Sequence, residues 1–132
     1  MTHDLYWLIA TLGATALMAL PYVFNRLLVR GLWGTLKNPA QDDAPLAAWA
    51  QRAQRAHSNA VENLVVFAPA VLAVYLLQLS NPVTTAACAL YFFARILHYG
   101  VYSAGIPVVR TLAWFGGWVA TAILILRAVG AL

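Results

Sequence analysis

The chain has 132 residues, of which 63% are hydrophobic and only 9% are charged, and its mean hydropathy is +0.75. A soluble domain carries about 25% charged residues, so we interpret residues 1–132 as a single integral membrane domain. The formal net charge of +4 does not indicate nucleic-acid binding, because the basic residues are spread among apolar runs and form no solvated basic face. The histidines and the single cysteine lack zinc-ligand spacing, so we expect no metal site.

Four apolar segments follow one another, each near the roughly 20 residues that a helix needs to cross a bilayer. They run from about Leu5 to Leu28, Pro45 to Leu79, Val83 to Ser103 and Pro107 to Val129. Pro21 predicts a kink in the first segment. The first connection, GLWGTLKNPAQDDAP, is the only true loop, and the other two are short. Short connections join antiparallel neighbours, which predicts an all-α, up-down bundle of four transmembrane helices.

Charged residues near the segment ends predict the orientation. Asp4 stands where a signal peptide carries positive charge, so we interpret the first segment as an uncleaved span. Basic residues collect on the cytoplasmic side of membrane proteins. Those flanking the first and third connections are Arg26, Arg30, Lys37, Arg52, Arg55, Arg95 and Arg110. We therefore expect the first loop to be cytoplasmic and both termini to lie outside.

A polar stripe interrupts the second apolar segment. Arg55, Asn59 and Glu62 are spaced by four and three residues, so they lie on one face of a helix. Charge at membrane depth is costly and usually faces a protein interior or a watery cavity, where it marks function. The stripe therefore predicts a binding site.

The third and fourth segments carry a second set of polar residues. Arg95, His98 and Tyr102 also share one helical face, and Arg110 and Thr111 lie about one turn into the fourth segment. All of them are near the predicted cytoplasmic ends of their helices. Antiparallel packing predicts that they meet the first stripe around one cavity.

The charge of that cavity favours an anion. Arg55, Arg95 and Arg110 oppose Glu62 alone, so positive charge remains even if one arginine pairs with it. A guanidinium group suits carboxylates and phosphates, and Asn59 and Glu62 add recognition of an amide or ammonium group.

Each of these residues also has an ordinary structural interpretation. Arg55 could be a topology anchor or the ion-pair partner of Glu62, and Arg95 could brace neighbouring helices. His98 could be a packing residue, Tyr102 an aromatic residue at the membrane interface, and Arg110 a side chain that snorkels to the membrane surface.

Two motifs resemble those of a known family. The pattern RAxxNxxE from Arg55 to Glu62, followed by Pro69, resembles the signature of the membrane-associated proteins in eicosanoid and glutathione metabolism (MAPEG). The pattern FARxxHxxxY from Phe93 to Tyr102, followed by Arg110, resembles the third-to-fourth-helix segment of the same family. The four-span layout agrees over nearly the whole chain.

The resemblance implies a homotrimer that binds glutathione between neighbouring subunits near the cytoplasmic side. Arg55, Asn59 and Glu62 would hold the peptide, with Glu62 at the γ-glutamyl amino group, and His98 and Tyr102 would line the same pocket. Arg95 is included among the candidate binding residues. Arg110 aligns with the arginine that stabilises the glutathione thiolate and is the candidate catalytic residue. Arg26 or Arg30 of a neighbouring subunit would complete the site; Arg30 is the one we assign.

Departures from the family pattern limit the functional prediction. Trp114 and Asn63 stand where the prostaglandin E synthases and the leukotriene-conjugating enzymes carry tyrosine, so neither activity is assigned. Short loops are typical of bacterial members, which implies a bacterial inner membrane. We predict a glutathione-dependent transferase or peroxidase that acts on lipophilic electrophiles or hydroperoxides. The alternative is a non-catalytic membrane protein that binds glutathione, lipid or another small anion; a purely structural trimer also stays open, whereas a transporter is disfavoured by the lack of an internal repeat.

Overall fold

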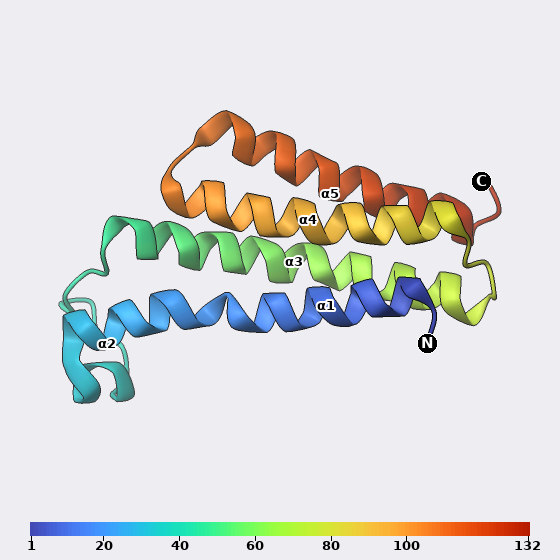
Figure 1. The fold of residues 1–132 in the computed structure, drawn as a ribbon. Helices are drawn as coiled ribbons and strands as arrows, with labels where there is room; N and C mark the ends of the chain where they lie inside the picture. Colours follow the sequence, from blue (N-terminus) through green and yellow to red (C-terminus); the bar gives the residue numbers. More distant parts are fainter.

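A computed structural model describes all residues of the chain, 1–132, as a bundle of helical rods. The helices are α1 (His3–Leu17), α2 (Ala19–Leu36), α3 (Ala48–Leu76), α4 (Pro82–Ala104) and α5 (Pro107–Ala128). α1 and α2 follow one another as a single rod, so four rods lie side by side (Figure 1). Both chain termini lie at one end of the bundle, and the α2–α3 and α4–α5 connections lie at the other.

The interruption between α1 and α2 falls at Met18, one turn before Pro21. Proline has no N–H group, so the carbonyl of Leu17 loses its helical partner. The expected irregularity in the first segment is therefore present, but the rod continues through it.

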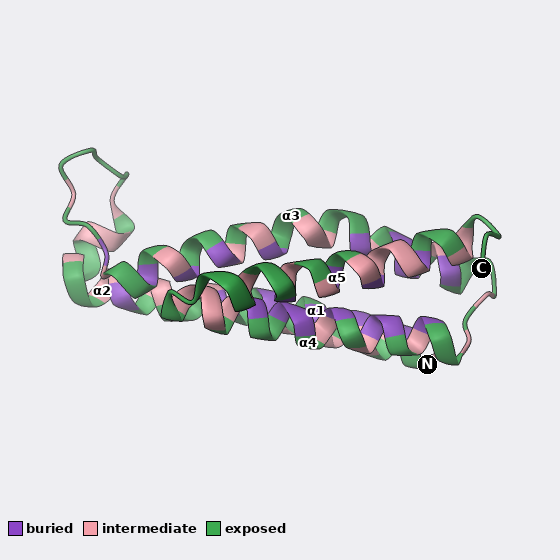
Figure 2. Ribbon diagram, turned by 90° about the horizontal axis from the view of Figure 1, so that it is seen from above, coloured by how far each residue is buried: buried purple, intermediate pink, exposed green.

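Membrane-spanning character is clearest in three of the four rods. Residues His3–Leu36, Ala48–Leu76 and Pro107–Ala128 are long and apolar enough to cross a membrane. α4 has comparable length and runs beside them, but it carries Arg95 and His98 in its C-terminal half and is not among the three, so the membrane span predicted from Val83 to Ser103 is not shown. Exposed residues lie along the outside of the rods (Figure 2), and many of them are large and apolar, as expected for an integral membrane protein.

The boundaries of α4 follow from its flanking residues. The Asn81 side chain accepts a hydrogen bond from the Thr84 N–H, 2.9 Å long, and the Thr84 hydroxyl accepts one from the Asn81 N–H, also 2.9 Å. This reciprocal capping box, with Pro82 in the first turn, fixes the start of the helix. Gly105 ends it with a φ of 83°, a left-handed conformation that glycine adopts at little cost.

The first connection differs from the prediction. The expected loop began at Gly31, but helix α2 extends to Leu36 with a bend at Gly31, where φ is 70°. The second apolar segment was expected to begin near Pro45, but α3 begins at Ala48. The buried side chain of Asn25 accepts a hydrogen bond from the Ala47 N–H, 3.1 Å long, and holds the chain extended before the helix.

A buried polar cluster joins α1 to α4 at the end of the bundle where the termini lie. The Asp4 side chain is 0% exposed. It accepts hydrogen bonds from the hydroxyls of Thr84, 2.8 Å, and Thr85, 2.5 Å. The carboxylate also lies beside the first turn of α4, where the helix dipole favours negative charge. Apolar packing continues from this cluster along the bundle, where the rings of Phe67 and Tyr91 stack with centroids 3.5 Å apart.

Candidate functional site

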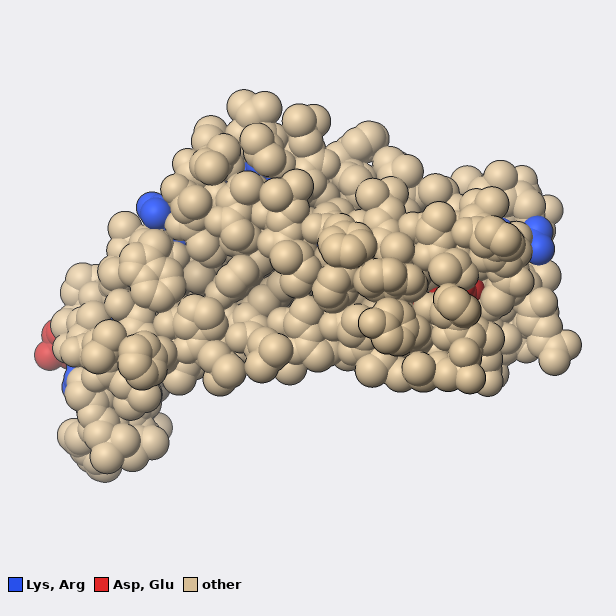
Figure 3. Space-filling model, viewed as in Figure 1, with Lys and Arg blue, Asp and Glu red and all other residues tan.

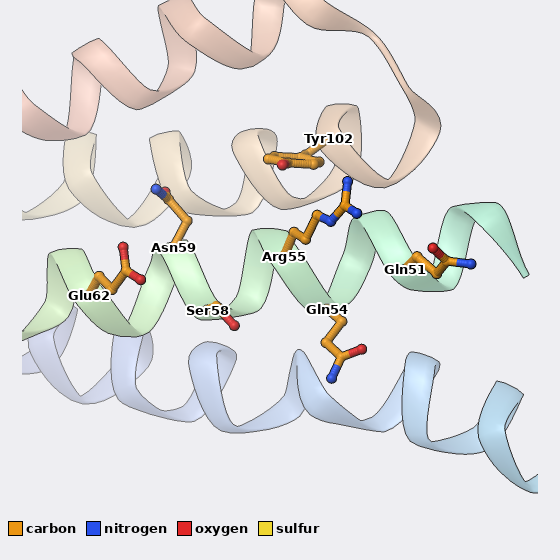
Figure 4. Close-up of a pocket in the computed structure, with 7 residues that line it drawn as sticks. All are labelled: Gln51, Gln54, Arg55, Ser58, Asn59, Glu62 and Tyr102. Atoms are coloured by element: carbon orange, nitrogen blue, oxygen red, sulfur yellow. The ribbon is translucent and has the colours of Figure 1, made fainter. Parts of the chain in front are cut away.

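The polar stripe of α3 forms one wall of an open cavity of about 510 Å³. Arg55 and Asn59 point towards α4, and the Arg55 guanidinium lies below the Tyr102 ring (Figure 4). Gln54 and Ser58 point to the other side of α3. The complete lining is Gln51, Gln54, Arg55, Ser58, Asn59, Glu62 and Tyr102.

A second cavity of about 300 Å³ adjoins the first. Asn59 and Tyr102 line both cavities, so the two form one continuous polar region between α3, α4 and α5. The second cavity is lined by Asn59, His98, Tyr102, Arg110, Thr111 and Trp114. Packing of α4 against α3 and α5 thus brings together residues from three separate stretches of sequence.

The Tyr102 ring contacts both Arg110 and His98 in the second cavity. The Arg110 guanidinium carbon lies 4.6 Å from the centroid of the Tyr102 ring, a cation–π contact. The His98 ring meets the same tyrosine edge to face, with centroids 5.5 Å apart. Arg110 is therefore held in place without a carboxylate partner, which leaves its charge available to a ligand.

Glu62 and Arg55 are both exposed to the cavity, and no ion pair joins them. The ion pairs of the chain are those of Asp43 with Arg30 and with Lys37. The possible pairing of Arg55 with Glu62 is thus not formed in the chain. A carboxylate and a guanidinium on one helical face, each without a charged partner, can bind opposite ends of a zwitterion.

Arg95 lines neither cavity, although it shares a helical face with His98 and Tyr102. Arg95 is only 2% exposed. Its guanidinium donates one hydrogen bond to the Asn59 side-chain oxygen, 3.2 Å long, and another to the Trp114 carbonyl, 3.1 Å long. Its Nε atom has no hydrogen-bond partner. Arg95 therefore joins α4 to α3 and α5 and positions Asn59, the residue common to both cavities.

Gly117 makes room for that guanidinium. A methyl group at Gly117 would lie 2.8 Å from Nη2 and 3.0 Å from Nε of Arg95, so the guanidinium would have to shift to admit it. The neighbouring Gly116 faces only the Ala94 methyl group, at 3.7 Å. Gly117 is thus part of the structure that fixes Arg95.

Arg30 lines neither cavity. Its Nε donates to the Ala44 carbonyl, 2.8 Å, and its Nη1 lies 3.6 Å from Asp43. Arg26, the other first-rod candidate, has a buried Nε atom without a partner. Gln51 and Gln54, by contrast, line the cavity and were not predicted, although their spacing to Arg55 and Ser58 on α3 was visible in the sequence.

The charges of the lining favour a small anionic ligand. Two arginines, Arg55 and Arg110, face one carboxylate, Glu62, so the excess is smaller than expected because Arg95 is withdrawn from it. The fold and the site together define a membrane-embedded helical bundle with a polar, positively charged cavity between its helices.

The comparison with protein families agrees with this class. The model of the MAPEG family matches residues 5–130, nearly the whole chain, and the protein belongs to this family. No individual curated protein and no solved structure matches it, so the assignment depends on the family model.

Proposed function

We propose that the protein is a membrane-embedded glutathione-dependent transferase or peroxidase that acts on lipophilic electrophiles or hydroperoxides. The observation that carries this proposal is the convergence of Arg55, Glu62 and Arg110 on two adjoining cavities, none of them with a charged partner in the chain. The family to which the chain belongs includes glutathione transferases and peroxidases.

The shape and charge of the region fit glutathione. Cavities of about 510 and 300 Å³ lie within the range of roughly 300–1,000 Å³ typical of small-molecule sites. The tripeptide carries two carboxylates, one ammonium group and a thiol, and the lining offers one carboxylate and two guanidinium groups, of which Arg110 is left for the thiolate. Glu62 would accept from the ammonium group, Arg55 would bind a carboxylate, and the Asn59 amide would meet the peptide backbone.

Arg110 would supply the chemistry. A thiol reacts as its thiolate, and a free thiol of this kind has a pKa of about 8.5. A guanidinium group nearby favours the charged form, and each tenfold change in the thiol–thiolate equilibrium requires about 1.4 kcal/mol of such stabilisation. In a transfer, the sulfur forms a bond to an electrophilic carbon and the leaving group departs with its electron pair, while Arg110 balances the negative charge and the thiol proton passes to water.

An apolar groove supports a lipophilic second substrate. A hollow of about 180 Å³ lies between α3 and α5 and is lined by Asn63, Val66, Trp118, Thr121, Ala122 and Ile125. Asn63 donates to the carbonyl of Asn59, 2.8 Å, so this groove begins one turn from the polar cavity. A substrate dissolved in the bilayer would reach the site through it.

The proposal includes the assembly and its orientation. We propose a homotrimer in a bacterial inner membrane, with the α2–α3 and α4–α5 connections in the cytoplasm. The site of a single subunit is open, and Arg30 of a neighbouring subunit would cover it. Cross-linking in membranes would test the stoichiometry.

Calorimetry of glutathione binding to the purified full-length protein tests the proposal. Arg55→Ala and Glu62→Gln should each weaken binding by about tenfold or more, because hydrogen bonds to charged groups contribute about 1.5–3 kcal/mol. Arg127→Gln is the matched control, since Arg127 binds the Leu79 carbonyl at the opposite end of the bundle, and it should bind normally. Failure of the wild type to bind glutathione would overturn the proposal.

The role of Arg110 separates catalysis from simple binding. Arg110→Ala should retain most of its glutathione affinity but lose turnover with a generic aromatic electrophile and with an organic hydroperoxide. Binding by the wild type without either reaction would instead support the non-catalytic alternative.

A further inference from the structure

The end of α2 forms a separate structural unit, which we call the α2 tip (residues 31–37). Gly31 has a φ of 70° and turns the helix there, so that the α2 tip leaves the bundle axis (Figure 1). Gly34 allows the turn to pack on α2, because a methyl group at this position would lie 2.8 Å from the Arg30 Cβ. Two glycines therefore specify the bend.

The polar side of the α2 tip is fixed by charges. Asp43 pairs with the Lys37 ammonium, 3.0 Å, and with the Arg30 guanidinium, 3.6 Å. Arg30 also donates to the Ala44 carbonyl, 2.8 Å, and Thr35 donates to the Gly31 carbonyl, 2.9 Å. These contacts tie the turn to the loop that follows it and neutralise part of its charge.

The opposite side of the α2 tip is apolar and has no packing partner. Leu32 is 68% exposed, Trp33 74% and Leu36 69%. In the space-filling view the tip is a protrusion whose visible face carries no charged groups, with charged atoms only along its upper edge (Figure 3). Three large apolar side chains held outward by a fixed turn require an apolar environment.

We propose that the α2 tip inserts Leu32, Trp33 and Leu36 into the boundary between lipid headgroups and acyl chains. The exposed side chains of Phe24 and Leu28 precede them on α2, and this rod is one of the membrane-spanning segments. The apolar surface of the tip is thus continuous with a surface that already faces lipid. The bend carries the turn away from the membrane normal and towards the membrane plane, which is the orientation of an interfacial amphipathic segment.

The composition of the turn agrees with that location. Tryptophan is enriched at the membrane–water interface, where its ring is apolar and its N–H group is solvated. Burial of apolar surface stabilises the inserted state by roughly 25 cal/mol per Å². The paired charges of Arg30, Lys37 and Asp43 stay on the aqueous side. The anchor would fix how deep the first rod lies in the bilayer.

Spin labelling in liposomes tests the proposal on the full chain. Cys88 is the only cysteine and is buried, so a Cys88→Ala background permits a single nitroxide label at Leu36→Cys. Gln41→Cys is the matched control, because Gln41 is exposed in the same connection but on its polar part. Collisions with oxygen, which concentrates in lipid, are compared with collisions with a water-soluble nickel chelate.

The label at position 36 should favour oxygen, and the label at position 41 should favour the nickel chelate. Trp33→Cys provides a second labelled position should Leu36→Cys be poorly expressed, and it should behave like position 36. Equal preference for the nickel chelate at positions 36 and 41 would overturn the proposal. Protection of position 36 from both reagents would also overturn it, because a second copy of the chain would then cover the tip. Neither result depends on glutathione binding.

Discussion

The bundle places charge between its helices in two regions, and it treats that charge in opposite ways. At the end where the termini lie, Asp4 is completely buried and accepts hydrogen bonds from Thr84 and Thr85. Midway along α3, Glu62 is exposed to an open cavity and has no charged partner. A charge whose hydrogen bonds are satisfied within the protein stabilises the fold. A charge that the fold leaves open requires a partner from outside.

Arg95 shows that position alone does not distinguish the two cases. It lies one turn from His98, which lines the second cavity, yet its guanidinium is buried and bonded to Asn59 and Trp114. Arg95 resembles Asp4 in its environment, because both side chains are buried and hydrogen-bonded within the protein. It resembles Arg55 in the sequence, because each arginine begins a row of polar residues at helical spacing. Burial and hydrogen-bond partners therefore indicate the role of a membrane-embedded charge better than its spacing does.

Replacing each carboxylate in turn should give opposite effects. Asp4→Ala removes two hydrogen bonds to a buried charged group, each worth about 1.5–3 kcal/mol, so we expect it to destabilise the protein by about 3 kcal/mol. Glu62→Ala should change stability by less than about 0.5 kcal/mol, since an exposed side chain without partners is removed. Thermal unfolding in detergent, combined with glutathione calorimetry, measures both effects.

Ligand binding should follow the reverse order. Asp4→Ala should bind glutathione normally at temperatures where it is folded, whereas Glu62→Ala should lose about tenfold or more in affinity. Thr85→Val is a milder, nearly isosteric companion to Asp4→Ala, because it removes only one of the two hydrogen bonds. A Glu62→Ala variant as unstable as Asp4→Ala would contradict the comparison.

Gly116 and Gly117, which are adjacent on α5, provide a test of the role of the buried Arg95. Gly117→Ala places a methyl group within 3.0 Å of the Arg95 guanidinium and should displace it, at a cost of about 1–3 kcal/mol for overpacking. Gly116→Ala meets only Ala94 at 3.7 Å. Both variants gain the same helix propensity, about 1 kcal/mol, so the difference between their unfolding temperatures isolates the steric effect.

Displacement of Arg95 should also weaken glutathione binding, because Asn59 loses its hydrogen bond from Arg95. This effect should appear in Gly117→Ala and not in Gly116→Ala. Equal stability and equal affinity of the two variants would show that Arg95 can move without consequence, and that it does not position Asn59.

Much of the architecture could be predicted from local sequence. Hydropathy and length locate the helical rods, and spacings of three and four residues place Arg55, Asn59 and Glu62 on one face. The boundaries of α4 follow from Asn81, Pro82 and Gly105, whose conformational preferences are local. These features depend on residues close together in the chain, which is why a single sequence reveals them.

The remaining features depend on contacts between distant segments. The burial of Arg95 requires the carbonyl of Trp114 and the missing side chain of Gly117, both on another helix. The partners of Asp4 are about 80 residues away, on α4. The bend at Gly31 could not be predicted, because a glycine in a loop sequence indicates flexibility and does not specify which positive-φ conformation the chain adopts.

The smallest expected effect concerns Asp43 and Lys37, which follow α2 and lie outside the membrane-spanning segments. The Ala40 N–H and then the Lys37 ammonium lower the pKa of Asp43 below its ordinary value of 3.8. A lowered folded-state pKa stabilises the turn at every pH above the ordinary value, and this stabilisation disappears as the pH falls through the folded-state pKa.

The mobility of a spin label at Leu36→Cys in liposomes should therefore be constant from neutral pH to about pH 4 and rise only below it. Asp43→Asn should abolish that transition, whereas Asp42→Asn, at a residue without an ion pair, should preserve it. A label whose mobility already changes between pH 5 and 7 would show that a group other than Asp43 holds the α2 tip, and the ion pairs would then contribute no more than ordinary surface pairs do.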